Sequence, residues 1–354
     1  MHHGEPSVFD IIRCVSFTRN SSGDAEEDMF VKRIVIFLTT TLFFASSLTG
    51  SADAKTFLSI ATGGTGGTYY PLGVGIADTL NRHLDDIHVS VRLGDASVAN
   101  INLIGTHQVE LAFAQNDIAY WGTKGIKPFK EAFSNIRVIA SLYPENVHCI
   151  ALKKSNIKSI SDFLGKRVSV GEPASGIQSN VAALLDVAGL KFSNMETEFL
   201  DFGSTAQRLR NGQIDIGFAV SGYPTRSVSD LALTTDIELV SFEDAFLDSL
   251  ISKYPFFVKS VIPSGTYKGT NTDIRTPAVR ALLVCDAATP DDIIYRVTKI
   301  FWKNIEEIRM VHEKAKLLTL ETALDGVSIK VHPGAAKFYV ESGIVVPAPG
   351  KQRE

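Results

Sequence analysis

Cysteine is scarce in this sequence: there are only three among 354 residues, Cys14, Cys149 and Cys285. No two of them form a C-x-x-C pair, which excludes a zinc ribbon and a thioredoxin-like redox motif. Cys149 and Cys285 could pair in an oxidising compartment, and their spacing leaves that open. We favour two separate buried thiols, because free cysteine packs as a small hydrophobic residue.

A strong excess of either charge is also missing. The chain has 35 Lys and Arg against 39 Asp and Glu, a formal net charge of −4, and no arginine-rich run interleaved with aromatics. We therefore expect no nucleic-acid partner. The composition, 45% hydrophobic and 21% charged, is that of a globular protein, and the length suits two domains.

No apolar run is long enough to be a stable membrane anchor. The longest, residues 34–48, is about 15 residues long, whereas a spanning helix needs roughly 20. It follows the charged pair Lys32-Arg33 and precedes the small-residue cleavage site Ala52-Asp53-Ala54. A charged start, a short apolar core and a small-residue exit are the three parts of a secretory signal peptide. We expect residues 29–54 to be this signal, cleaved after Ala54 on export to the periplasm. Residues 1–28 are then a non-native extension before a true start at Met29; the alternative is a single-pass anchor.

Motifs for catalysis and for cofactors are missing as well. No Lys follows Gly67, which excludes a phosphate-binding P-loop, and Tyr69 stands where a dinucleotide fingerprint needs its third glycine. The chain has no G-x-S-x-G elbow and no H-E-x-x-H zinc motif, and its histidines are scattered. The sequence therefore predicts no enzyme, no cofactor and no metal site.

What the chain does contain is an alternation of strands, glycine-rich turns and helices. A strand at 57–60 runs into the turn 63–68, and the next helix has apolar residues at every fourth position, Leu72, Ile76, Leu80 and Leu84. A strand at 88–93 and a helix opened by Ser97 follow. This alternation indicates an α/β fold with a largely parallel sheet.

A second unit repeats the arrangement, with a strand at 167–170, a turn at 171–176 and a helix at 177–187. Segments 108–114 and 213–219 are also near copies of each other. These repeats predict two α/β lobes built on one plan, joined by a hinge with a ligand cleft between them. We expect the chain to cross from the first lobe to the second near 142–149 and to return to the first lobe near 255–263. Lobe 1 is then 55–143 plus 263–354, and lobe 2 is 144–262.

The turns that end strands and open helices carry the functional signal. The first turn of a helix has free backbone N–H groups at the positive end of the helix dipole, and Ser and Thr hydroxyls add neutral donors. Such turns bind anions without Lys or Arg. The alternative is that Thr68, Ser97 and Ser175 only cap their helices.

The segment 63–73, GGTGGTYYPLG, resembles the opening signature of the TAXI family, the TRAP-associated extracytoplasmic immunogenic proteins, and especially its 31 kDa immunogenic antigens. The likeness continues, in order, through residues 97–100, 114–121, 140–145, 165–176, 221–225, 263–267 and 332–335. The resemblance implies a type II-like periplasmic binding protein, a monomer, that hands a small anionic solute to the membrane permease subunits of a TRAP transporter. Family solutes are small acids such as glutamate or dicarboxylates.

From the turns we expect both lobes to contact the ligand. In the first lobe, Tyr69 or Tyr70 covers the apolar part of the solute, and in the second lobe the contacts come from the start of the helix at 177–187. These residues are Thr65, Gly66, Gly67, Thr68, Tyr69, Tyr70, Ser97, Asn100, Gln115, Ser175 and Gly176. The resemblance adds Tyr143, Ser221 and Tyr223.

Two residues depart from the family pattern. Ile177 stands where a Thr often follows the Ser-Gly of the second-lobe turn in the family. Asp95 stands where the family usually has a small residue. Both leave the identity of the solute open. A sensory receptor of the same fold that feeds a membrane kinase is the alternative function, and a secreted enzyme is a weaker one.

Overall fold

The computed structural model describes residues 55–94, 96–126 and 128–347. The expected N-terminal extension, the signal peptide and the departure at Asp95 lie outside these residues. Within the described ranges, none of the helices combines the length and apolar character that crossing a membrane requires.

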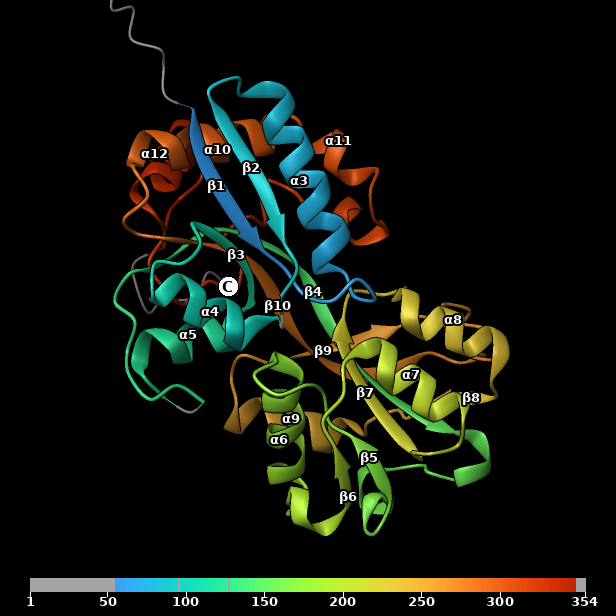
Figure 1. Ribbon diagram of the computed structural model, residues 1–354. Coiled ribbons are helices and arrows are strands. Elements are labelled where there is room, and N and C mark those ends of the chain that lie inside the picture. Colours follow the sequence, from blue (N-terminus) through green and yellow to red (C-terminus); the bar gives the residue numbers. More distant parts are fainter. Residues whose placement is uncertain (1–54, 95, 127, 348–354) are drawn as a thin grey trace, which may run out of the picture. The chain divides into compact units, whose positions relative to one another are not determined.

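The first lobe is built on three parallel strands. β1 (Thr56–Ala61) pairs with β2 (Ile87–Arg92) and with β3 (Leu111–Gln115). Each strand leads into a helix: α3 (Tyr69–His83), α4 (Ser97–Gly105) and α5 (Asn116–Lys124). These bounds confirm the strands and helices expected here, and Leu72, Ile76, Leu80 and Leu84 are all buried in the core. The helices α10 (Asp291–Lys303), α11 (Ile305–Arg309) and α12 (Pro333–Glu341) complete the lobe (Figure 1).

The second lobe repeats the plan. β5 (Arg167–Ser169) pairs in parallel with β6 (Glu196–Glu198) and with β7 (Ile216–Ser221). Its helices are α6 (Gly176–Val187), α7 (Phe202–Arg210), α8 (Arg226–Thr234) and α9 (Asp244–Lys253). The near copies in the sequence become β3 and β7, which occupy equivalent places and are buried along their whole length.

Two long strands run through both lobes. β4 (Ile136–Leu152) and β10 (Ile274–Asp286) pair antiparallel with each other, and the sheet order is β2-β1-β3-β10-β4-β7-β5-β6 (Figure 1). β10 is also antiparallel to β3, and β4 to β7. The sheet is therefore mixed rather than largely parallel, because each crossing strand enters a lobe against the direction of its neighbours. The short strands β8 (Ile237–Leu239) and β9 (Val258–Ile262) pair with β4 and β10.

On β4 the core of the first lobe ends at Tyr143 and that of the second begins at Val147, so we place the crossing between the lobes at Pro144 and Glu145. Pro144 lies opposite Arg280, next to a register shift in β10, where the missing N–H of a proline is tolerated. The crossing falls in the window 142–149. The return differs from the expected 255–263: Tyr267 and Ile274 still pack in a core of the second lobe. The β9–β10 hairpin keeps this segment there, and we place the return near Arg280.

Both cysteines of the described region are buried and free, Cys149 on β4 and Cys285 on β10. The expectation of two separate thiols is confirmed. Burial raises the pKa of both thiols, so they remain protonated.

Candidate functional site

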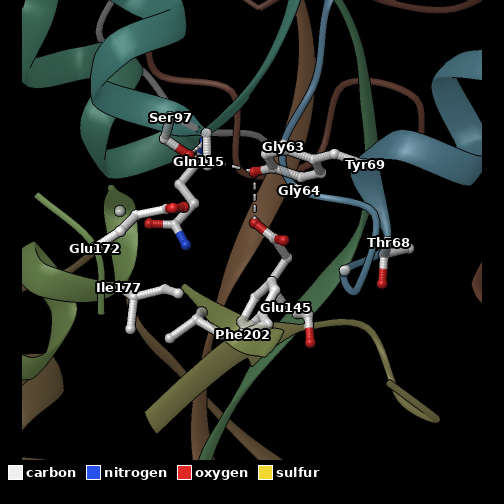
Figure 2. A pocket seen from close by; sticks show the side chains of 15 residues that line it. Gly63, Gly64, Thr68, Tyr69, Ser97, Gln115, Glu145, Glu172, Ile177 and Phe202 are labelled. Carbon is white, nitrogen blue, oxygen red and sulfur yellow. Dashed lines mark hydrogen bonds between the residues drawn. The ribbon is translucent and has the colours of Figure 1, made fainter. Parts of the chain in front are cut away.

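Five helix N-termini converge on one cavity. The first residues of α3, α4, α6 and α7 line it, and Gln115, the residue that precedes α5, projects into it (Figure 2). The cavity has a volume of about 30 Å³, and all the space that its lining borders, part of it open to solvent, is about 400 Å³. Its lining residues are Gly63, Gly64, Gly67, Thr68, Tyr69, Ala96, Ser97, Gln115, Glu145, Glu172, Gly176, Ile177, Phe202, Val220 and Ser221. The fold brings these ends together because all five helices follow the carboxyl ends of strands in the two halves of the sheet.

The cavity combines a mostly apolar wall with a few polar groups, none of them on a basic side chain of the described residues. Among its described lining residues there is no Lys, Arg or His, while Glu145 and Glu172 contribute carboxyl groups. The positive character therefore comes from the backbone N–H groups of the first helical turns and from the helix dipoles. Such a site is suited to an anionic group on a small solute.

Two glycines allow the walls to approach each other. A Cβ atom on Gly176 would overlap the Oε1 atom of Gln115, which reaches across from the end of β3. A Cβ atom on Gly67 would lie 2.6 Å from Cε2 of Phe202. Gly66 is different, because a Cβ atom there would make only ordinary contacts at 3.5 Å. The walls therefore approach each other at Gly67 rather than at Gly66.

Glu145 reaches the cavity from the crossing point of β4 and is only 2% exposed. The Tyr69 hydroxyl donates a hydrogen bond of 2.8 Å to Glu145 Oε2. Burial raises the pKa of Glu145 to about 8, against the lowering effect of this hydrogen bond. The carboxyl group is therefore mostly protonated at neutral pH.

A second buried acid lies beside this cavity. Asp117, in the first turn of α5, accepts a hydrogen bond of 2.9 Å from Nδ2 of Asn180 on α6. Burial raises the pKa of Asp117 to about 7. Its Oδ1 atom is buried without a hydrogen-bond partner among the described residues. The pair thus links the two lobes through an incompletely satisfied acid.

Backbone strain occurs on both sides of the cavity. Ala96, which lines it, has a φ of 65°, and Ala174, in the turn before α6, has a φ of 62°. Residues other than glycine rarely adopt such angles, at a cost of about 1–3 kcal/mol each. The carbonyl oxygen of Ala174 accepts a 3.1 Å hydrogen bond from the backbone N–H of Ala99, again between the lobes.

Half of the expected ligand residues lie on this cavity. They are Gly67, Thr68, Tyr69, Ser97, Gln115, Gly176 and Ser221. The Ser97 hydroxyl accepts a hydrogen bond from the backbone N–H of Gln115 at 3.1 Å rather than capping α4. Thr68 does not cap α3 either, and its Oγ1 atom is buried without a partner in the described structure.

The other expected residues are placed elsewhere. Thr65 and Gly66 line an adjoining, larger cavity that shares Gly64, Glu172 and Phe202 with the first and includes Arg210 and Arg226. Neither cavity is lined by Tyr70, Asn100, Tyr143, Ser175 or Tyr223. Their contact with a solute stays a prediction.

Three of these residues have roles within the fold. Asn100 donates hydrogen bonds to the carbonyl oxygens of Thr62 and Phe113, which ties together the ends of β1 and β3. Ser175 caps α6 by accepting from Gln178 N. The Tyr223 ring lies 3.1 Å from the Nζ atom of Lys314.

The model of the NMT1-like family matches residues 60–343, which is most of the chain and includes every residue of the cavity. The chain belongs to the NMT1-like family.

The chain is also similar to solved structures of binding proteins. PhnD1 from Prochlorococcus marinus (MIT 9301), in complex with methylphosphonate, is 12% identical over 74% of this chain and 90% of that chain, with a TM-score of 0.51. A binding protein component of an ABC phosphonate transporter from Pseudomonas aeruginosa is 12% identical over 82% and 95%, with a TM-score of 0.49. The periplasmic aliphatic sulphonate binding protein SsuA from Escherichia coli is 12% identical over 80% and 83%, with a TM-score of 0.42. The family match together with the likeness to PhnD1 shows a two-lobe fold of the periplasmic binding protein type.

The sequence analysis missed the acids and the aromatic wall of the cavity. Glu145 is in a segment that resembles the TAXI family, but nothing in the local pattern shows that β4 changes lobes there. Phe202 follows Asp201, whose side chain accepts a hydrogen bond from Ser204 N and caps α7. An Asp before a helix is a recognisable N-cap signal, so the start of α7 could have been predicted.

Proposed function

We infer that this protein is the periplasmic solute receptor of a TRAP-type transporter of the TAXI class, which captures a small carboxylate-bearing solute between its lobes. Closure around the solute then presents it to a membrane permease. The expected solute is a glutamate-like amino acid or a dicarboxylate. The assignment to the TAXI class rests on the sequence resemblance at 63–73 and along the mature chain.

The observation that carries the proposal is the convergence of five helix N-termini on one cavity with no basic side chain among its described lining residues. A carboxylate placed there receives backbone N–H donors from both lobes, which no arrangement on one lobe could supply. The related fold of PhnD1 holds an anion, methylphosphonate, which supports anion capture as the use of this architecture. Ile177 lines the cavity and offers an apolar contact where the family often has a hydroxyl.

A thermal-shift screen tests this proposal. Purified protein is melted with amino acids, keto acids, dicarboxylates, methylphosphonate and alkanesulfonates. A solute at one hundred times its dissociation constant adds about 2.7 kcal/mol to the free energy of unfolding, which gives an easily measured rise in melting temperature. If no acid of the panel raises the melting temperature, or if only phosphonates and sulfonates do, the proposal of a carboxylate receptor is wrong.

A matched pair of glycine variants locates the site. In Gly176→Ala the added methyl group collides with Gln115 across the cavity, so we expect the ligand-induced shift to be lost. In Gly66→Ala the methyl group meets Phe202 and Ser227 at ordinary contact distance, so the shift should persist. If the solute raises the melting temperature of both variants equally, it binds elsewhere.

A further inference from the structure

We propose that Glu145 selects the solute by accepting a cationic ammonium group, so that the site takes an amino acid and disfavours a dicarboxylate of the same length. This inference rests on the proposed function, because it divides the two solute classes that the helix N-termini alone accept equally.

The position of Glu145 carries the argument. Its side chain lies on the cavity wall at the crossing point of β4, where Figure 2 shows the carboxyl group directed toward Tyr69 and the glycine loop. One oxygen accepts the Tyr69 hydroxyl at 2.8 Å. An ionised carboxylate has about four acceptor sites, so a solute donor can be added without displacing Tyr69.

The charges around Glu145 favour a cation on the solute. Asp117 lies close enough to raise the pKa of Glu145 further, and Glu172 lines the same cavity. Two basic side chains on elements that contact β4 have other partners. Arg280 donates to Ser141 Oγ at 2.9 Å, and Lys314 lies over the Tyr223 ring. A second carboxylate on the solute would meet this acidic side of the cavity with no basic lining residue to balance it.

The two sides of the cavity therefore have opposite preferences. The helix N-termini of α3, α4 and α6 stabilise negative charge, and Glu145 stabilises positive charge. A zwitterionic amino acid presents both groups on one carbon atom, whereas a dicarboxylate satisfies only the first. Selection by Glu145 explains why an acid is retained in a cavity that otherwise suits anions.

The proposal predicts a proton released on binding. Buried Glu145 is mostly protonated at pH 7, since its pKa is raised to about 8. An ammonium group beside it stabilises the carboxylate, so a proton leaves to the buffer. The titratable groups that face Glu145 are Tyr69 on α3, Tyr143 on β4, Asp117 on α5 and Glu172 before α6. Both tyrosines have raised pKa values and remain neutral in this range.

Calorimetric titrations of the wild type use matched pairs that differ only in the amino group: glutamate and glutarate, aspartate and succinate, alanine and propionate. Putrescine is added as an amine without a carboxylate. Titrations at pH 7 in phosphate and in Tris, buffers with different heats of ionisation, give the number of protons released. In the pair that binds, we expect the amino acid to bind at least about tenfold tighter than the compound without the amino group. Its binding should release close to one proton.

The variant Glu145→Gln should lose about tenfold or more in affinity for the amino acid, should lose the proton release, and should bind the deaminated partner as well as or better than the wild type. Glu243→Gln, the same side-chain replacement at an exposed residue before α9, is the control. Tighter binding of the deaminated partner to the wild type, or unchanged amino-acid binding in Glu145→Gln, overturns the inference and leaves the carboxylate receptor standing. If only putrescine binds, and Glu145→Gln abolishes that binding, Glu145 does accept an ammonium group but the proposed carboxylate receptor is wrong. If no amine-bearing compound binds, the inference is wrong.

Discussion

At the scale of single residues, Ser175 shows how a cap and a ligand contact are told apart. Its hydroxyl donates to the carbonyl oxygen of Glu172 at 2.7 Å and accepts from the backbone N–H of Gln178 at 3.3 Å. Both hydrogen bonds stay inside the turn that opens α6, and the residue is 1% exposed. The hydroxyl is therefore already used by the fold.

We predict that Ser175→Ala lowers the free energy of unfolding of the unliganded protein by about 1 kcal/mol, the usual cost of losing an N-cap. Affinity for the solute should stay within about threefold of wild type. Melting curves without ligand and calorimetric affinity measure the two effects. A tenfold loss of affinity with an unchanged melting temperature would instead make Ser175 a ligand contact, as its position in the turn suggests from sequence alone.

The buried acids give the unliganded protein a distinctive pH dependence. The pKa of Glu145 is raised from 4.5 to about 8 and that of Asp117 from 3.8 to about 7, in both cases mainly by burial. As pH rises, both groups ionise at a lower pH in the unfolded chain than in the folded protein. Between the unfolded and the folded pKa of each group, the folded state therefore binds more protons than the unfolded state. The free energy of unfolding therefore falls as pH rises, by up to about 1.4 kcal/mol per pH unit for each group.

We predict that the wild type melts at a lower temperature at pH 8 than at pH 5.5, and that Glu145→Gln reduces this difference because the amide does not titrate. Melting curves of both proteins at the two pH values test this. Parallel pH dependence in the two proteins would show that Glu145 ionises in the folded state as easily as in water.

At the scale of elements, local patterns predicted the first strands and helices of the first lobe. The four-residue spacing from Leu72 to Leu84 identifies α3, because a helix turns this face to the core at every fourth residue. The two crossing strands could not be predicted in the same way. β4 is 17 residues long and buried along most of its length, so it has no alternating pattern that marks where one lobe ends. The site residues on it, Glu145 above all, were missed for that reason.

A pair of aromatic contacts joins elements of the two lobes away from the cavity. The ring of Phe256, between α9 and β9, lies 5.1 Å from Tyr120 and 6.3 Å from Trp121, both on α5. Such pairs contribute about 0.5–1.5 kcal/mol beyond their buried area. These contacts are made only when the lobes are together, so they stabilise the closed arrangement.

We predict that Phe256→Ala weakens solute binding roughly three- to tenfold, mainly through faster dissociation, because the closed state is less favoured. The matched control is Phe57→Ala, since Phe57 is 69% exposed on the first lobe. Stopped-flow dissociation rates compare the variants. Identical rates for wild type and Phe256→Ala would show that the aromatic contact plays no part in closure.

At the scale of the whole molecule, the described lobes meet through contacts that also enclose the cavity. Asn180 donates to Asp117, Ala99 N–H donates to Ala174, and Phe202 lies against Gly67. A solute held by helix N-termini of both lobes cannot enter while all of these contacts are made. The paired strands β4 and β10 are the parts of the sheet that both lobes share, and the register shifts between Arg280 and Val284 are where the pairing is least regular. We therefore expect the hinge at this pair of strands.

This arrangement predicts a larger average size without solute than with it. Separation of the lobes breaks the contacts around the cavity, the aromatic pair and the contact of Lys314 with the Tyr223 ring, while β4 and β10 remain intact. Small-angle scattering of the purified protein should then give a radius of gyration that decreases when the solute found in the thermal-shift screen is added. Phe256→Ala should begin at an equal or larger radius and should need more solute to reach the compact value. If the radius of the wild type is unchanged at a solute concentration that calorimetry shows to be saturating, the lobes do not close around the solute, and binding must occur in a cavity that is already assembled.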